Sequence, residues 1–310
     1  MILRGLTMRG SNHGSNLMTF WNILGALAII VLAAAVAVEG AQREDLAKTK
    51  IEKKTCQAPD GVKIVYSATG SGEPALIFVH GGLADRTFWD GQLEAFAAGH
   101  RTIALDLPGH GESGVNRKKW GIPEFGADVR AVVESEKLKR VVFIGNSLGG
   151  PVAIEAALLL PGRAVGVIGI DTFQSLEYKI TPEEARQRAE AFRRDFAGSV
   201  KAMVRSLFHS DADPKLVADA ERRMAKSSPE AAYEMFLSLG GYDVSASARK
   251  LEVPLRALNG DLYPTDLKGV RQVKADFDVI VLPHTGHYPM LERPDEFNRR
   301  LAEIIEGLSK

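Results

Sequence analysis

A glycine-rich pentapeptide holds a serine in a setting that suits a nucleophile. Ser147 lies at the centre of Gly145-Asn146-Ser147-Leu148-Gly149, a G-x-S-x-G pattern between an apolar run at 141–144 and a helical pattern that begins at Gly150. A strand that turns sharply into a helix holds one residue at a strained backbone angle, and flanking glycines remove Cβ atoms that would collide there. The pattern therefore predicts an exposed Ser147 hydroxyl at the strand tip, beside the positive end of a helix dipole.

A second glycine-rich segment could supply hydrogen-bond donors to the same chemistry. The residues His80-Gly81-Gly82 follow an apolar run at 75–79. We expect the backbone N–H groups of Gly82 and Leu148 to form an oxyanion hole, in which each donor contributes about 10²- to 10³-fold in rate. We interpret His80 as a structural hydrogen-bonding residue rather than a base.

One histidine is placed to act as a base. His287 follows the apolar run at 278–282 and precedes the final helical pattern at 294–308. Residues at the carboxyl ends of parallel strands meet at one edge of a sheet, so the His287 side chain can reach Ser147. An imidazole there would accept the serine proton and later return it to the leaving group. His284 lies nearer the strand and lacks a preceding glycine, and for this reason we favour His287.

These residues need a framework, and the chain alternates strand and helix patterns from about residue 50 onward. The predicted strands occupy 50–55, 63–67, 75–79, 102–105, 141–144, 165–170, 255–258 and 278–282. Such alternation is typical of an α/β fold with a mostly parallel central sheet flanked by helices. We expect residues 42–173 and 249–310 to form this core.

The stretch 174–248 breaks the alternation, because it contains helical patterns and no convincing strand. Helix starts are indicated where Thr181, Asp213 and Ser228 each precede a proline. An all-helical insertion between two strands is expected to form a cap over one end of the sheet. We interpret the charges at 186–195 as a solvated face. Six side chains of the insertion could line a pocket, but we expect most to pack: Phe192, Phe208, Tyr233, Met235, Phe236 and Tyr242.

Taken together, these motifs resemble the α/β-hydrolase fold family, in its capped esterase and lipase type. The resemblance covers about residues 50–310 and is carried by 80–82, 106–113, 145–149 and 286–297. It implies a serine hydrolase that cleaves an ester or related acyl bond of a small molecule through an acyl-enzyme intermediate. It implies no cofactor and no metal, and it makes the segment 106–113 mainly a structural turn.

In this family a carboxylate orients the histidine and completes a Ser-His-Asp triad. The match to the family is weakest at this acidic residue. The family usually places it after the seventh strand, a few residues beyond a glycine, but here Asp261 follows Gly260 directly. We assign the acid to Asp261, because it is the carboxylate nearest to the family's usual position and also lies in the family's chain order of Ser, Asp and His. Asp171, at the tip of the sixth strand, is the main alternative, and Asp266 is a weaker one.

Two other functions remain open at this point. Relatives with Gly-Asn-Ser at this turn include carbon–carbon bond hydrolases, to which Asn146 points weakly. Some proteins of this fold bind a ligand without catalysis, and a displaced acid would suit an impaired triad. Trapping of a covalent serine adduct would separate catalysis from binding.

The composition of the chain indicates which classes of binding partner to expect. Its 310 residues include 39 Lys and Arg against 39 Asp and Glu, so the formal net charge of +0 gives no reason to expect a nucleic-acid partner. A small-molecule substrate is expected instead. The single cysteine, Cys56, excludes an internal disulfide and a cysteine-based metal cluster.

The first 41 residues are expected to be a targeting segment and not part of the fold. Arg4 and Arg9 precede a nearly uncharged, apolar stretch at 17–38. Alanines at 35 and 37 give the A-x-A pattern of a cleaved export signal. A permanent membrane anchor is the alternative, because a span needs about 20 apolar residues. In either case we expect an exported protein, periplasmic or secreted, or one anchored by this segment.

Overall fold

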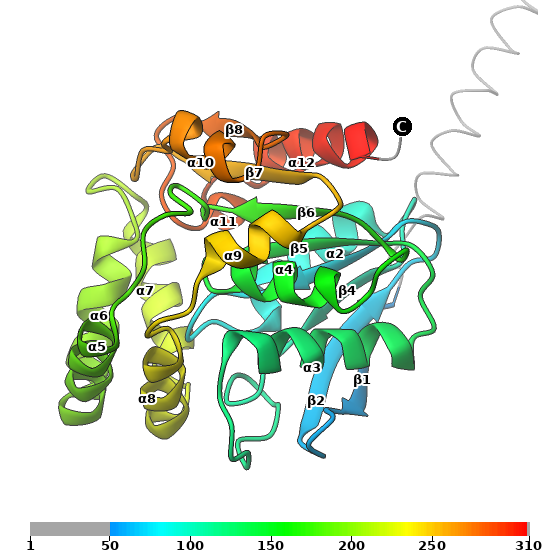
Figure 1. The fold of residues 1–310 in the computed structure, drawn as a ribbon. Coiled ribbons are helices and arrows are strands. Elements are labelled where there is room, and N and C mark those ends of the chain that lie inside the picture. Colours follow the sequence, from blue (N-terminus) through cyan, green and yellow to red (C-terminus); the bar gives the residue numbers. More distant parts are fainter. Residues whose placement is uncertain (1–49, 309–310) are drawn as a thin grey trace, which may run out of the picture. The chain divides into compact units, whose positions relative to one another are not determined.

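A mostly parallel sheet forms the centre of the computed structural model, which describes residues 50–308 (Figure 1). Its strands are β1 (Glu52–Gln57), β2 (Lys63–Thr69), β3 (Ala75–Val79), β4 (Thr102–Leu105), β5 (Val141–Asn146), β6 (Ala164–Ile170), β7 (Leu255–Gly260) and β8 (Asp278–Leu282). Within the described residues, they pair in the order β1-β2-β4-β3-β5-β6-β7-β8, and only β2 runs antiparallel to its neighbours. The predicted α/β fold is confirmed.

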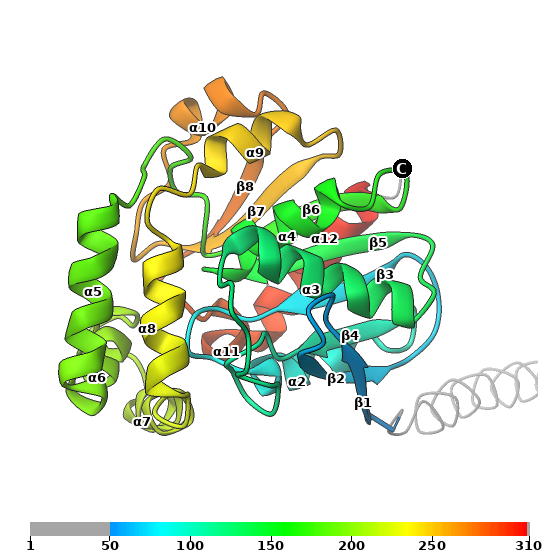
Figure 2. The same ribbon diagram turned by 60° about the horizontal axis from the view of Figure 1, so that its bottom comes forward.

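Helices cover both faces of the sheet, which explains why its central strands are apolar throughout. Every residue of β3 and β5 is buried. The helices α3 (Ile122–Ser135) and α4 (Gly149–Leu158) pack against each other on one face, and α2 (Asp90–Phe96) and α12 (Pro294–Leu308) contact each other on the opposite face (Figure 2). Three short helices complete this framework: η1 (Arg86–Trp89), α10 (Leu267–Val273) and α11 (Pro289–Glu292).

Between β6 and β7 the chain forms a helical insertion, whose last helix ends at Lys250, two residues beyond the expected boundary at 248. Its helices are α5 (Pro182–Arg194), α6 (Phe196–Ser206), α7 (Pro214–Met224), α8 (Pro229–Ser238) and α9 (Val244–Lys250). Thr181, Asp213 and Ser228 accept hydrogen bonds from the first turns of α5, α7 and α8, as their positions before proline predict. Helices α5–α8 lie together beyond one end of the sheet (Figure 1), and α9 returns to pack on α4.

The predicted export signal or anchor, residues 1–41, lies outside the described residues. Within residues 50–308, no helix is both long and apolar enough to cross a membrane. The same residues contain no group of three or more His, Cys, Asp or Glu side chains that could hold a metal ion.

Candidate active site

The candidate nucleophile lies at a sharp turn between β5 and α4. Ser147 has a φ of 52°, in the left-handed region that non-glycine residues rarely adopt. The turn is tight enough that a Cβ atom at Gly145 would overlap the carbonyl oxygen of Gly149, and one at Gly149 would overlap that of Val79. The two glycines of the motif are therefore required by close backbone approach, and Ser147 is held at the strand tip in the predicted strained conformation.

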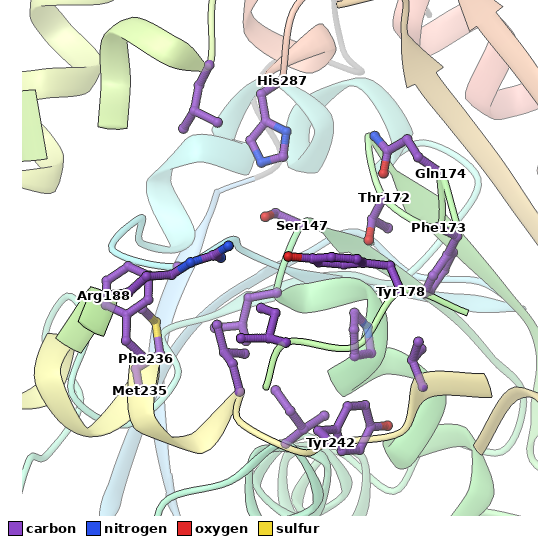
Figure 3. A pocket seen from close by; sticks show the side chains of 18 of the residues that line it. Ser147, Thr172, Phe173, Gln174, Tyr178, Arg188, Met235, Phe236, Tyr242 and His287 are labelled. Atoms are coloured by element: carbon purple, nitrogen blue, oxygen red, sulfur yellow. The ribbon is translucent and has the colours of Figure 1, made fainter. Parts of the chain in front are cut away.

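Ser147 lines a cavity of about 340 Å³ between the sheet and the helical insertion. The core supplies Gly82, Leu148 and His287 to its wall, as the sequence predicts for the site. Figure 3 shows the His287 ring and the Ser147 side chain beside each other in this cavity. The insertion supplies a largely apolar wall, which includes Ile180, Met203, Leu207, Met235, Phe236, Leu239 and Val244.

A buried carboxylate fixes the orientation of His287. The Nδ1 atom of His287 lies 2.5 Å from Oδ2 of Asp171, at the tip of β6. The other oxygen, Oδ1, accepts a hydrogen bond from the backbone N–H of Gly260 at 3.0 Å, and Asp171 is 1% exposed. A carboxylate can only accept here, so His287 donates through Nδ1 and keeps the Nε2 lone pair for another partner. This is the tautomer that a base for Ser147 requires.

The backbone of His287 is held from three sides. Its N–H donates to the carbonyl of Leu207 in the insertion at 2.8 Å, and its carbonyl accepts from Nδ2 of Asn146 at 3.0 Å. Glu292 accepts from the N–H groups on either side of His287, those of Gly286 and Tyr288, at 2.9 and 3.1 Å. Sequence patterns did not reveal the contacts of His287 with Leu207 and Asn146, because these residues are distant from it in the chain.

The prediction that Asp261 orients His287 is wrong. Its carboxylate accepts from the backbone N–H groups of His284 and Thr285 at 2.9 and 3.1 Å and pairs with Nε2 of His209 at 2.9 Å. Desolvation opposes ionisation, but these hydrogen bonds outweigh it and lower the Asp261 pKa to about 2. These partners hold the Asp261 side chain at the surface, where it is 37% exposed. Asp171, the alternative, occupies the position beside His287.

The two backbone N–H groups expected to form an oxyanion hole have no acceptor in the part of the chain that the structure describes. Within residues 50–308, the N–H groups of Gly82 and Leu148 donate to no acceptor, and both residues line the cavity. His80 fixes the loop that carries Gly82: its Nε2 accepts from the N–H of Leu107 at 3.0 Å, so its Nδ1 donates to the carbonyl of Gly81 at 2.7 Å. Burial lowers the pKa of His80 to about 4, which keeps this neutral tautomer. His80 is structural, as the sequence analysis inferred.

The insertion contributes more to the cavity than its sequence suggested. Met235, Phe236 and Tyr242 line the cavity, whereas Phe192 and Phe208 are buried among other residues. The Met235 side chain packs directly against Gly82. Arg188 belongs to the charged run interpreted as a solvated face; its side chain is exposed, in line with that interpretation, and it also lines the cavity.

The segment 106–113 is the structural turn that the resemblance implies. Asp106 is buried and accepts hydrogen bonds from the backbone N–H groups of Arg86 and Glu112 at 2.7 and 2.8 Å, and it pairs with the Arg86 guanidinium. None of the residues 106–113 lines the cavity.

Curated proteins similar to this chain include a "Pimeloyl-[acyl-carrier protein] methyl ester esterase" of Nitrosospira multiformis, 28% identical over 79% of this chain and 97% of its own length. A "3-oxoadipate enol-lactonase 2" of Acinetobacter baylyi is 24% identical over 82% of this chain and 97% of its length.

Solved structures similar to this chain also include proteins described as esterases. A thermophilic esterase from Thermogutta terrifontis superposes with a TM-score of 0.74 at 24% identity, over 84% of this chain and all of that one. A putative aryl esterase from Burkholderia cenocepacia gives a TM-score of 0.71 at 26% identity, over 83% of this chain and 99% of that one. The alpha/beta hydrolase family itself matches residues 76–300. This match covers most of the chain, and it agrees with the sharp turn at Ser147 and with the sheet that carries it. The chain therefore belongs to the alpha/beta hydrolase family and is a hydrolase.

Proposed function

We propose that this protein hydrolyses a carboxylic ester of a small molecule through an acyl-enzyme formed on Ser147. The observation that carries the proposal is the hydrogen bond between His287 and the buried Asp171, next to Ser147 in the wall of one cavity. The Gly82 and Leu148 N–H groups add two backbone donors at the same wall. The relatives named as a methyl ester esterase and an enol-lactonase support the choice of an ester bond.

In the first half of the reaction, Oγ of Ser147 attacks the ester carbonyl carbon while Nε2 of His287 accepts the hydroxyl proton. The carbonyl oxygen becomes an oxyanion, which the N–H groups of Gly82 and Leu148 stabilise. When the tetrahedral intermediate collapses, the bond between carbon and the alcohol oxygen breaks, and His287 returns its proton to the leaving alcohol. Asp171 keeps His287 in the required tautomer and stabilises the imidazolium that forms.

In the second half, water attacks the acyl-enzyme. His287 accepts a proton from that water, the same two N–H groups stabilise the second oxyanion, and the Ser147 oxygen leaves with the proton held by His287. The products are the carboxylic acid and the free enzyme. This sequence needs no group beyond the named residues and water.

The cavity sets the scale of the substrate. Its volume of about 340 Å³ lies at the small end of the range of about 300–1,000 Å³ that ligand pockets span. Apolar side chains of the insertion form most of the wall opposite Ser147. A short or medium chain, rather than a long acyl chain, fits these dimensions.

The test is hydrolysis of p-nitrophenyl acetate and butyrate by the full-length protein and by Ser147→Ala, with fluorophosphonate labelling of both. We expect turnover and labelling of the wild type, and loss of both in the variant, because the probe and the substrate need the same oxygen. Circular dichroism of both proteins controls for folding. A folded wild-type protein that neither turns over esters nor takes the label would overturn the proposal and favour a ligand-binding role.

A further inference from the structure

One cation faces the cavity without an anion to pair with it. Among the described residues that line the cavity, Arg188 of α5 is the only one with a permanent charge, and none is an aspartate or glutamate. Figure 3 shows the Arg188 guanidinium extending into the cavity toward the space beside Ser147. The Tyr178 hydroxyl reaches the same space from the opposite side. The two polar groups therefore line the same cavity as the candidate nucleophile.

The guanidinium of Arg188 is free to bind a ligand. Among residues 50–308 it forms no hydrogen bond and no ion pair within 4 Å, although the Glu184 carboxylate attracts it electrostatically from a longer distance. The nearest carboxylate along the helix, Glu184 one turn earlier, accepts hydrogen bonds from the backbone N–H and the hydroxyl of Thr181, as part of the capping box of α5. A substrate group could contact Arg188 without first displacing a protein partner.

The chemistry of this pair favours a carboxylate. A guanidinium presents parallel N–H donors that match the two oxygens of a carboxylate, and a tyrosine hydroxyl can donate a further hydrogen bond. Arg188 and Tyr178 are both exposed, so they lie where the cavity meets solvent. A single cation there balances the single negative charge of a carboxylate, whereas a phosphate dianion would leave one charge unpaired.

We propose that Arg188, assisted by Tyr178, binds a carboxylate of the substrate. The preferred substrates would then be esters that carry a free carboxylate at a distance from the scissile bond, such as half-esters of dicarboxylic acids. The inference deepens the proposed function and rests on it for the position of the scissile ester at Ser147. Apolar residues between the two sites would contact the methylene spacer of the substrate.

The test compares monomethyl esters of succinic, glutaric, adipic and pimelic acids with the matching neutral dimethyl esters, using the full-length protein. Arg188→Gln removes the charge and Arg188→Lys keeps it without the planar fork. Arg186→Gln is the matched control, because Arg186 is an exposed arginine of the same helix that does not line the cavity.

We expect Arg188→Gln to lower kcat/KM for the best half-ester by about 10- to 100-fold, the range for loss of a charge-assisted hydrogen bond. The dimethyl esters should change by less than about threefold, and Arg188→Lys should fall between Gln and wild type. Arg186→Gln should leave both substrate classes unchanged. Equal effects of Arg188→Gln on half-esters and diesters would overturn the inference, while hydrolysis of the diesters would leave the proposed function intact.

A binding measurement tests the proposed carboxylate site independently of catalysis. Calorimetry with glutarate and adipate on Ser147→Ala should detect binding that Ser147→Ala with Arg188→Gln loses. If the wild type hydrolyses no ester, the proposed function fails, and dicarboxylate binding that depends on Arg188 would still support the carboxylate site. Absence of such binding, or tighter binding of inorganic phosphate than of either dicarboxylate, would overturn it.

Discussion

At the residue scale, each oxygen of the Asp171 carboxylate accepts a hydrogen bond from a different donor. Oδ1 accepts from the N–H of Gly260 and Oδ2 from Nδ1 of His287. The backbone of Asp171 has a φ of 43°, and its N–H donates to the carbonyl of Leu258. The tips of β6 and β7 thus hold the carboxylate in one orientation, and through it they fix the tautomer and ring plane of His287.

This geometry predicts a large difference between two conservative substitutions. Asp171→Asn should lower kcat for p-nitrophenyl acetate by about 10⁴-fold, because the amide cannot hold the tautomer in which His287 accepts the Ser147 proton. Asp261→Asn should lower kcat by less than about tenfold, since the amide oxygen still accepts one of the N–H groups of His284 and Thr285. The reverse ranking in steady-state kinetics, with both variants folded by circular dichroism, would return the acid to the β7 loop.

The sequence restricts the acid to a few candidates, and the assignment to Asp261 was the wrong one. Asp171 and Asp261 both follow strands and both lie between Ser147 and His287 in the chain, so chain order does not separate them. The choice depends on the direction in which each side chain leaves its strand. Asp261 turns to the rim because the 284–285 backbone offers two N–H groups there. Such long-range partners leave no mark in the spacing, whereas Ser147 and His287 carry local glycine signals.

At the element scale, α7 joins the helical insertion to the loop that follows β3. Arg223 of α7 donates to Oγ1 of Thr87 at 2.6 Å, lies 3.7 Å from the Asp85 carboxylate, and stacks 3.8 Å from the centre of the Phe88 ring. These three residues lie at η1, a few positions after Gly82. The insertion therefore helps to hold the loop that carries one of the proposed oxyanion donors.

Loss of this contact should destabilise the fold. Arg223→Ala removes hydrogen bonds to partly buried groups and leaves Asp85 without its arginine, a change worth about 1–3 kcal/mol, and we expect Tm to fall by about 2–10 °C in differential scanning calorimetry. Arg222→Ala is the control: its side chain is 62% exposed and pairs only with Asp219 of the same helix, so it should change stability by less than about 0.5 kcal/mol. Equal Tm values for the two variants would show that α7 does not stabilise the loop.

Helix starts in the insertion follow from sequence, but the choice of its cavity-facing side chains does not. Thr181, Asp213 and Ser228 cap their helices as local hydrogen-bond chemistry dictates. Arg188, in contrast, lies in a run of charged residues whose composition is that of a solvated surface. It faces the cavity because α5 docks beyond the strand ends, and docking depends on contacts between elements far apart in the chain.

At the scale of the whole molecule, three buried groups make stability depend on pH. The rings of His80 and His110 lie 4.9 Å apart, and burial lowers their pKa values to about 4 and about 3. Among the described residues, Nε2 of His110 has no hydrogen-bond partner. Burial has the opposite effect on an acid, and it raises the pKa of Asp128, which pairs with Arg117, to about 6.

The sign of the dependence follows from counting protons in the two states. Between about pH 4 and pH 6, both histidines are neutral in the folded protein and protonated in the unfolded chain, whose histidine pKa is about 6.5. In the same range Asp128 is protonated when folded and ionised when unfolded. On unfolding, the two histidines therefore gain protons and Asp128 releases one. Because two of these groups oppose one, stability should fall as the pH is lowered through this range.

Two substitutions should move this slope in opposite directions. His110→Gln removes one of the two groups that gain a proton on unfolding, so the free energy of unfolding should depend less steeply on pH between about pH 4.5 and pH 5.5. Asp128→Asn removes the opposing group and keeps a hydrogen-bonding group for Arg117, so the dependence should become steeper. Urea unfolding at intervals from pH 4.5 to pH 7 measures each slope independently of any change in stability at neutral pH. A wild-type slope retained in both variants would mean that other groups carry the dependence, because only the titration of the substituted residue differs between the curves.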